Sequence, residues 1–229
     1  MLNVSDVFVS YGQSEALHGV SFTANANETV AIMGRNGMGK TTLFKSLIGI
    51  LPLKSGKIAV DGAEVSQDES YRRVAQGIAY VPQGRMIFPT LSVEENIKTG
   101  LENAKDKRIP EEIYALFPVL FDMRRRKGGN LSGGQQQQLA IARALVTNPK
   151  VLLLDEPTEG IQPSIIKDIA AALNEIRKMR KITIVVSEQV LSFAMAVADR
   201  LFVIEGGRLV HESTRDATDV ARIKQFLSV

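Results

Sequence analysis

The stretch GRNGMGKTT occupies residues 34–42 and decides the fold of this 229-residue chain. An apolar run at 30–33 leads into it, and apolar residues at helical spacing follow it. The local order is therefore strand, glycine loop, helix. Glycines let the backbone turn tightly, so that successive N–H groups converge on a phosphate chain at the positive end of the helix. The stretch predicts a polyphosphate-binding loop; a glycine turn that only caps a buried helix is the alternative.

Seven residues of this stretch are expected to hold the ligand. They are Gly34, Asn36, Gly37, Gly39, Lys40, Thr41 and Thr42. Lys40 would reach the β- and γ-phosphates, the Thr41 hydroxyl would ligate Mg²⁺, and Thr42 would bond a phosphate nearer the nucleoside. The stretch therefore indicates a nucleoside triphosphate with its magnesium ion.

An acidic pair, Asp155 and Glu156, ends another apolar run at 151–154. Ligands of parallel sheets bind outside the carboxyl ends of the strands, so both acids are expected to face the phosphates held by the glycine loop. We assign Asp155 to the metal, through water, and Glu156 to the general base that polarises an attacking water. A solvated strand end that turns at Pro157 is the alternative.

A second pair of glycines lies in LSGGQ, residues 131–135, just before a helical pattern. A hydroxyl and two glycines at a helix start form a geometry that suits an anion. Two explanations remain open from the residues alone. Either Ser132 only caps the first turn of the helix, or the segment grips the same nucleotide from a second molecule.

Composition narrows the class of protein. The chain has 45% hydrophobic and 23% charged residues and no cysteine, which fits a globular domain in a reducing compartment without disulfides or cysteine-based zinc sites. The formal charge of +3 is too small for a nucleic-acid coat, so no nucleic-acid partner is expected. No apolar run is long enough to cross a bilayer, and the first ten residues do not resemble a secretion signal.

The remaining patterns predict an α/β fold with a helical insertion. Strands are expected at 2–9, 20–24, 28–33, 78–81, 151–154 and 182–186, a crossover helix at 164–179, a hairpin around Gly206 and Gly207, and a final helix at 216–227. We divide a single domain, 1–229, into a nucleotide-binding core with a β subdomain, 1–86 and 149–229, and a helical subdomain, 87–148, that carries LSGGQ.

With these motifs in this order, the chain resembles the ATP-binding-cassette (ABC) family of transport ATPases over essentially its whole length. Tyr11 stands where the family stacks an aromatic ring on adenine, and Gln83 stands at its Q-loop glutamine. The resemblance implies a P-loop NTPase fold: a RecA-like parallel sheet core, an N-terminal antiparallel β subdomain and an inserted α-helical subdomain. It implies ATP and Mg²⁺ as cofactors, ATP hydrolysis as the activity, and Gln83 in both the catalytic and the metal sets.

The resemblance also implies partners. In the family, two ATP-binding subunits sandwich two ATP molecules head to tail, so Ser132, Gly134 and Gln135 would contact the nucleotide of the other subunit. Integral-membrane permease subunits would dock near residues 86–89, which follow Gln83; core packing of those residues is the alternative. The expected location is the cytoplasm, on the inner face of the membrane, with an extracytoplasmic solute-binding protein as an indirect partner.

Three further stretches, at 87–96, 131–139 and 159–164, resemble the ATPase subunits of branched-chain amino-acid importers and of their urea-importer relatives, the urea branch more closely. Two positions depart from the general family pattern. Gln189 stands at the place of a switch histidine, and Gln162 at that of the D-loop aspartate. A glutamine can hydrogen-bond a phosphate but carries no proton charge, so Glu156 is expected to perform hydrolysis while Gln189 only positions.

Two rival functions remain open. One is a soluble mechanical ABC ATPase that acts on nucleic acid or ribosomes, which would need a coiled-coil insertion, a zinc element or a second cassette. The other is a module that senses ATP without hydrolysing it. Retention of Lys40 and Glu156 favours turnover over sensing.

Overall fold

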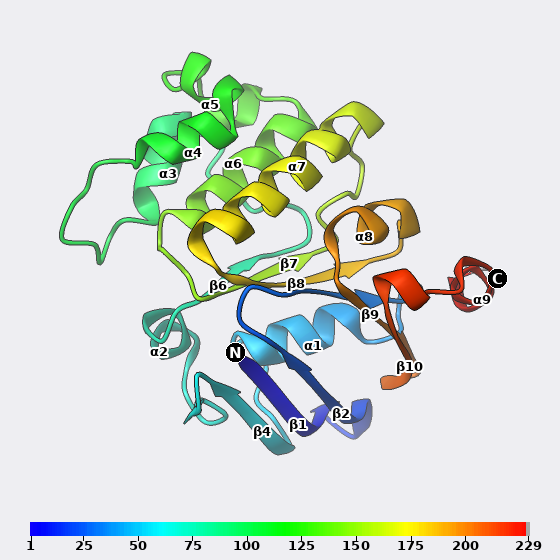
Figure 1. Ribbon diagram of the computed structural model, residues 1–229. Coiled ribbons are helices and arrows are strands. Elements are labelled where there is room, and N and C mark those ends of the chain that lie inside the picture. The colour runs from blue at the N-terminus through cyan, green and yellow to red at the C-terminus, as the bar shows by residue number, and fades with distance from the viewer. Residues whose placement is uncertain (228–229) are drawn as a thin grey trace.

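The computed structural model describes residues 1–227. Two sheets face each other with helix α1 (Lys40–Leu47) between them, and most of the other helices form a layer on the far side of the larger sheet (Figure 1). Among residues 1–227, no helix is both long enough and apolar enough to span a bilayer.

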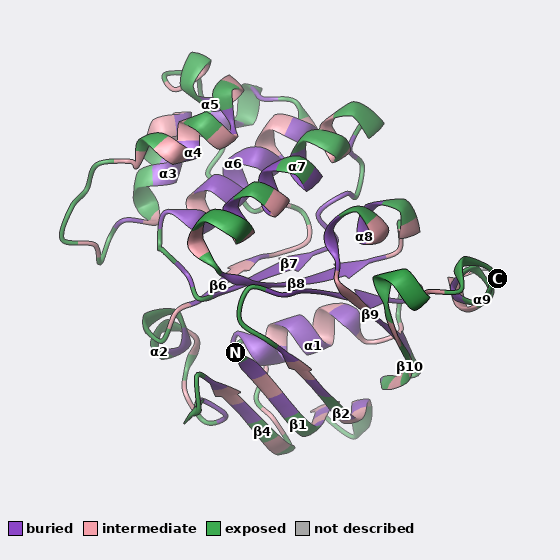
Figure 2. Ribbon diagram, in the orientation of Figure 1, coloured by how far each residue is buried: buried purple, intermediate pink, exposed green. Residues whose placement is uncertain are grey.

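The larger sheet has six strands in the order β10-β9-β3-β8-β7-β6. Its members are β3 (Thr29–Met33), β6 (Ile78–Val81), β7 (Val151–Asp155), β8 (Thr183–Glu188), β9 (Arg200–Glu205) and β10 (Arg208–Thr214). All neighbours pair in parallel except β9 and β10, which form an antiparallel hairpin. Figure 2 shows that the central strands are buried along their length, as in a sheet covered on both faces.

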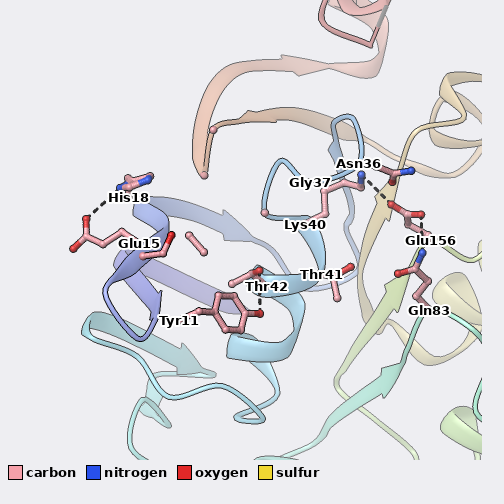
Figure 3. A pocket seen from close by; sticks show the side chains of 15 residues that line it. Tyr11, Glu15, His18, Asn36, Gly37, Lys40, Thr41, Thr42, Gln83 and Glu156 are labelled. Carbon is pink, nitrogen blue, oxygen red and sulfur yellow. Dashed lines mark hydrogen bonds and ion pairs between the residues drawn. The ribbon is translucent and has the colours of Figure 1, made fainter. Parts of the chain in front are cut away.

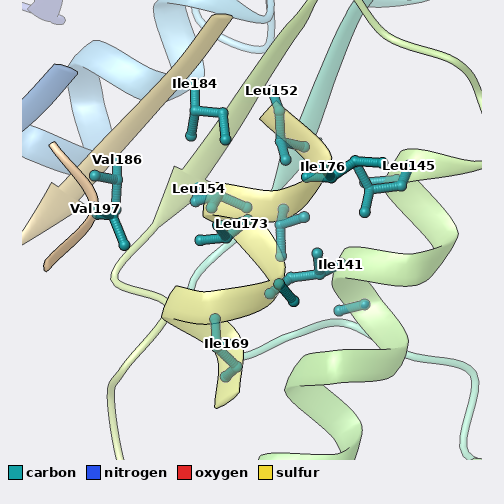
Figure 4. Close-up of a cluster of buried hydrophobic side chains, with 14 of the residues drawn as sticks. Ile141, Leu145, Leu152, Leu154, Ile169, Leu173, Ile176, Ile184, Val186 and Val197 are labelled. Carbon is teal, nitrogen blue, oxygen red and sulfur yellow. The ribbon is translucent and has the colours of Figure 1, made fainter. Parts of the chain in front are cut away.

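Alternate residues of the central strands supply two separate cores. In β7, Leu152 and Leu154 face the helical layer, whereas Val151 and Leu153 face α1. The helical-layer core is closed by α6 (Gly133–Leu145) and α7 (Pro163–Arg180), as Figure 4 shows. The apolar stripe of α7 predicted from its spacing is therefore the face that packs on the sheet.

The smaller sheet is antiparallel, in the order β2-β1-β4-β5. It consists of β1 (Leu2–Tyr11), β2 (Ser14–Ala24), β4 (Ser55–Val60) and β5 (Ala63–Glu64). Its inner face packs on Leu43, Phe44 and Leu47 of α1. Because both sheets pack on α1, the start of this helix is held from two sides, and that start carries the glycine loop.

The remaining helices are α2 (Ser70–Ala75), α3 (Val93–Thr99), α4 (Glu111–Leu116), α5 (Pro118–Asp122), α8 (Leu191–Val197) and α9 (Val220–Leu227), with short 3-10 turns at Gly128–Asn130 and Arg215–Ala217. Within the described chain, residues 87–148 contain helices, turns and loops but no strand.

The predicted fold class is confirmed, and three details differ from expectation. Strands β4 and β5 and helices α2 and α8 were not predicted. The second strand begins at Ser14, earlier than expected. The final helix begins at Val220 and not at residue 216, because a 3-10 turn precedes it and the Asp219 carboxylate accepts the N–H groups of Ala221 (2.9 Å) and Arg222 (3.2 Å).

Candidate active site

A cavity of about 640 Å³ opens at the start of α1 (Figure 3). Nine of the predicted site residues line it: Tyr11, Asn36, Gly37, Gly39, Lys40, Thr41, Thr42, Gln83 and Glu156. The parallel register explains why they meet. It sets Met33 beside Glu188 and Asp155 beside Ser187, so the carboxyl ends of β3, β7 and β8 lie level at one edge of the sheet.

Two glycines of the loop are required by the backbone or its surroundings. Gly39, the residue before α1, has φ +104°, a conformation that side chains rarely adopt. Gly34 has an ordinary φ, but a Cβ there would lie 2.7 Å from the Ile204 carbonyl oxygen. The loop therefore passes close against strand β9, and its N–H groups are presented at the start of α1.

Lys40 is buried in its own loop, with 3% of its surface exposed. Its ammonium group donates to the carbonyl oxygens of Gly34 (2.7 Å) and Arg35 (2.9 Å) and pairs with Glu156 Oε1 at 2.9 Å. An ammonium group has three donors, so these three contacts use its capacity. A phosphate that draws Lys40 must compete with Glu156 for it.

Glu156 adopts a left-handed backbone conformation, φ 48°, which costs a non-glycine residue about 1–3 kcal/mol. Its N–H is held by Ser187, through the carbonyl oxygen (3.1 Å) and the hydroxyl oxygen (3.0 Å). Two amides flank the carboxylate, Gln83 Nε2 at 3.4 Å from Oε2 and Gln189 Nε2 at 3.4 Å from Oε1. This held carboxylate lies in the cavity, where a general base would be needed.

Asp155 is more deeply buried than Glu156, with 1% of its surface exposed, and it does not line the cavity itself. Its carboxylate accepts hydroxyl groups from Ser187 (2.6 Å), Tyr80 (3.2 Å) and Thr41 (3.3 Å). Burial raises the pKa of Asp155, and the three hydrogen bonds oppose that effect. The adjacent oxygens of Thr41 and Asp155 fit Mg²⁺, which favours oxygen ligands and usually binds through few carboxylates plus phosphates and water.

Glu188 organises the site, a role that was not predicted from the sequence. Its buried carboxylate accepts the N–H groups of Thr158 (3.1 Å), Gln189 (3.0 Å) and Val190 (3.1 Å). Burial is the main cause that raises its pKa. Gln189, positioned in this way, donates to Asn36 Oδ1 at 2.6 Å. Glu188 therefore holds together the segment after β7 and the segment before α8, and through Gln189 it connects both to Asn36 of the glycine loop.

The opposite wall of the cavity starts at Tyr11, whose hydroxyl lies 3.3 Å from Thr42 Oγ1. Half of the Tyr11 surface is exposed, so a flat ring could stack against it. Sequence reasoning missed the rest of this wall: Ser14, Glu15, Ala16, His18, Gly206 and Gly207. The turn between β9 and β10 reaches the glycine loop through the bond from Gly207 N–H to the Met38 carbonyl oxygen (3.1 Å).

The LSGGQ residues do not line this cavity. Ser132 is exposed and forms a capping box with Gln135: its hydroxyl oxygen accepts the Gln135 N–H (3.3 Å), and the Gln135 side chain accepts the Ser132 N–H (2.9 Å). Gly134 is buried against α7, where a Cβ would lie 2.7 Å from Ile165 Cγ2. The capping role raised for Ser132 is therefore present. A hydroxyl that accepts one bond still has its own proton to donate.

A second cavity, of about 460 Å³, lies between β6, α3 and α6 and is lined in part by Met86, Phe88 and Arg143. Met86 and Phe88 are 68% and 47% exposed, which contradicts core packing for these two residues, whereas Ile87 packs on the helical-layer core. The Asn96 side chain fixes this edge by bonding both the N–H (2.8 Å) and the carbonyl oxygen (2.9 Å) of Phe88.

The chain is similar to known proteins over most of its length. The ABC transporter family model matches residues 17–159. The chain is 39% identical over 217 residues to the high-affinity branched-chain amino acid transport ATP-binding protein BraG of Pseudomonas aeruginosa, with 93% of each covered. It is 33% identical over 220 residues to the lipopolysaccharide export system ATP-binding protein LptB of Haemophilus influenzae, covering 93% of this chain and 90% of that one.

Solved structures agree with the fold. A nucleotide-free ATP-binding cassette from an ABC transporter matches with a TM-score of 0.81 at 28% identity, covering 100% of this chain and 95% of the other. A dimeric cassette in a post-hydrolysis state, bound to ADP and Pi, matches with a TM-score of 0.85 at 24% identity, covering 94% and 99%.

Proposed function

The chain belongs to the ABC transporter family, and from this premise we propose that it is the subunit whose ATP hydrolysis powers a solute importer. As an ABC ATPase it uses ATP with Mg²⁺ and hydrolyses it. We propose in addition that the transporter it powers imports its solute and does not export it. The observation that carries it is the identity of 39% to a branched-chain amino acid transport subunit across 93% of both chains.

We assign the chemistry to the residues around the cavity. Tyr11 would stack on adenine, the glycine loop with Lys40 and Thr42 would hold the phosphates, and Thr41, Asp155 and Gln83 would hold Mg²⁺. Glu156 would act as general base, because its carboxylate lies beside Lys40 at 2.9 Å and so close to where a γ-phosphate would bind.

Gln189 would position the attacking water and the γ-phosphate without carrying charge. Its amide already contacts Asn36 and Glu156, two residues of the cavity. A neutral amide at this place cannot titrate, so Gln189 itself adds no proton-dependent step to turnover.

Two copies of the chain, or one copy with a sister subunit, would close head to tail over two nucleotides. Ser132, Gly134 and Gln135 lie outside the cavity that holds Lys40, and Ser132 is exposed, which supports a role toward another subunit. Closure completes both phosphate shells, so ATP would favour the closed pair by population shift.

Mixing two inactive variants tests this arrangement. Lys40→Ala removes the phosphate-binding lysine, and Ser132→Arg obstructs the LSGGQ segment. In a mixed dimer, one composite site has both defects and the other has none. Partial recovery of ATPase activity on mixing is expected. If neither variant is rescued although mixed dimers form, the head-to-tail arrangement is wrong.

The cavity beside Met86 and Phe88 would receive a short helix of a permease. An exposed apolar patch next to a groove suits an amphipathic helix, and Gln83, three residues before Met86, connects this groove with the nucleotide cavity. The protein would then work on the cytoplasmic face of the membrane, with a solute-binding protein as an indirect partner on the other side.

Branched-chain amino acids and urea or related short amides are the proposed solutes. We would purify the chain with its permeases, place the complex in lipid nanodiscs, and add the solute receptor loaded with leucine, urea or acetamide. Stimulation of ATPase activity by one loaded receptor identifies the solute. Stimulation by lipopolysaccharide and by none of the three would contradict import and favour the export function of the LptB relatives.

A further inference from the structure

Arg85 lies between two glycines, and it packs closely against one of them, Gly133. A Cβ built on Gly133 would lie 3.3 Å from both Nη atoms of Arg85 and 3.4 Å from its Cζ, so the guanidinium lies flat against that residue. On the other side, a Cβ on Gly160 would lie 3.6 Å from Arg85 Nη2. The side chain therefore sits between the LSGGQ segment and the segment 156–160 that follows β7.

Glu159 receives two bonds from the loop that contains Arg85. Arg85 Nη2 donates to the Glu159 carbonyl oxygen at 3.0 Å, and Gln83 Nε2 donates to the Glu159 carboxylate at 3.1 Å. The Glu159 N–H in turn bonds the Glu156 carbonyl oxygen at 3.2 Å. A change in the position of Glu156 or Gln83 is therefore transmitted to the guanidinium that lies on Gly133.

The backbone of this loop is constrained as well. Arg85 and Met86 both have left-handed conformations, φ 67° and 45°, which are rare for residues with a side chain. Arg143 from α6 donates to the carbonyl oxygens of Arg85 (3.4 Å) and Met86 (2.9 Å). Helix α6 thus contacts the loop twice: Gly133 at its start touches the Arg85 guanidinium, and Arg143 holds the Arg85 main chain.

We propose that Arg85 is a positioning residue for ATP hydrolysis, which fixes the LSGGQ segment of each subunit relative to Gln83 and the segment 156–160 of the same subunit. The inference rests on the proposed role of LSGGQ toward a second subunit. It adds a specific link: the state of one nucleotide cavity sets how the same subunit presents LSGGQ to its partner. A planar guanidinium is needed, because one group must lie flat on a glycine and also donate to a carbonyl oxygen.

Arg85→Ala tests the link by separating nucleotide binding from turnover. ATP affinity should stay within about twofold, because no ligand-holding residue of the cavity is changed, whereas kcat should fall about tenfold or more through misplacement. In a Glu156→Gln background, ATP-dependent dimerisation, measured by analytical ultracentrifugation, should weaken in parallel. Arg85→Lys should restore little of either property. Arg125→Ala, which removes an exposed arginine of the turn after α5, is the matched control.

A double-mutant cycle with Gly133→Ala gives a readout that a merely structural role would not move. The added methyl group would lie 3.3 Å from the guanidinium and push it aside slightly, so it should lower kcat measurably in the native chain and much less once Arg85 is alanine. Independent effects in the cycle, or an Arg85→Ala variant that turns over and dimerises like Arg125→Ala, would overturn the proposal. The assays use ATPase activity without permeases, so an Arg85 effect would persist even if import proved to be wrong.

Discussion

The nucleotide cavity and the LSGGQ segment are both glycine-rich helix starts, but they meet their hydrogen-bonding needs in different ways. In the cavity, Lys40 pairs with Glu156 and Asn36 with Gln189, partners more than a hundred residues apart in sequence. In the LSGGQ segment, Ser132 and Gln135 satisfy each other three residues apart. The first is a site assembled within one chain. The second is a preformed surface outside the cavity, which fits its proposed role toward another subunit.

The largest effect expected within the cavity is that of Glu156→Gln. Loss of the general base should lower kcat by about a hundredfold or more, while ATP affinity is retained because Lys40 stays available to the phosphates. Steady-state phosphate release and binding of a fluorescent ATP analogue measure the two quantities. Glu175→Gln, an exposed change on α7, is the control. An unchanged ATPase rate in Glu156→Gln would refute the assignment.

On the LSGGQ side, Gly134→Ala should have the largest effect on folding. The new Cβ would lie 2.7 Å from Ile165 Cγ2, so α6 and α7 must separate, at a cost of about 1–3 kcal/mol in the free energy of unfolding. Urea unfolding measures this cost. Gly133→Ala at the same helix start, where the added methyl group meets only the flexible end of Arg85, should cost clearly less. Equal costs would mean that helix packing does not require Gly134.

Ser132→Ala tests whether Ser132 only caps helix α6 or also takes part in ATP hydrolysis. Removing the capping box should cost about 1 kcal/mol in the free energy of unfolding. Ser92→Ala removes the same kind of capping box, at the start of α3, and is a matched control. Both variants should lose similar stability, but only Ser132→Ala should also lower ATPase activity. If both leave activity unchanged, Ser132 is a cap alone.

The smallest expected effect is a stability change of opposite sign at two aspartates. The pKa of Asp155 is raised by burial, so the folded state binds this proton more tightly than the unfolded state, and the stability contributed by that proton is lost as pH rises from about 4 through the folded pKa. Asp155→Asn should therefore raise Tm at pH 7 by a few degrees, even as it removes Mg²⁺-dependent activity.

Asp61 provides the contrast. Hydrogen bonds from Lys150 and the N-terminal amino group lower the pKa of Asp61 from its ordinary value of 3.8 to about 2. Its stabilisation is therefore fully present above 3.8 and is lost as pH falls through about 2. Asp61→Asn should lower Tm slightly at pH 7, and the decrease should shrink as pH falls from 3.8 through about 2. Thermal melts of both variants across pH test the pair; a shift of the same sign in both at pH 7 would contradict this account.

Local patterns predicted more of the site than of its supports. The glycine loop, Asp155 and Glu156 were predictable because each lies within a few residues of the strand that positions it. Glu188 was not, because the link it makes depends on Thr158, whose N–H reaches the Glu188 carboxylate only when β7 and β8 pair. The wall at Gly206 and Gly207 depends in the same way on where the hairpin packs. Strand β4 has a glycine and a lysine and only three apolar residues, so its sequence alone does not indicate a strand. It forms because β1 pairs with it.

The contact between Lys40 and Glu156 also affects which anions the cavity accepts. Each group is the counter-ion of the other, and both are almost fully buried. A monoanion such as chloride or acetate offers Lys40 no more charge than Glu156 already does, and by displacing Glu156 it leaves that buried carboxylate without its cation. A triphosphate with its metal supplies both charges at once. The internal ion pair therefore favours ligands that carry several negative charges together with a metal ion, whatever base is attached to them.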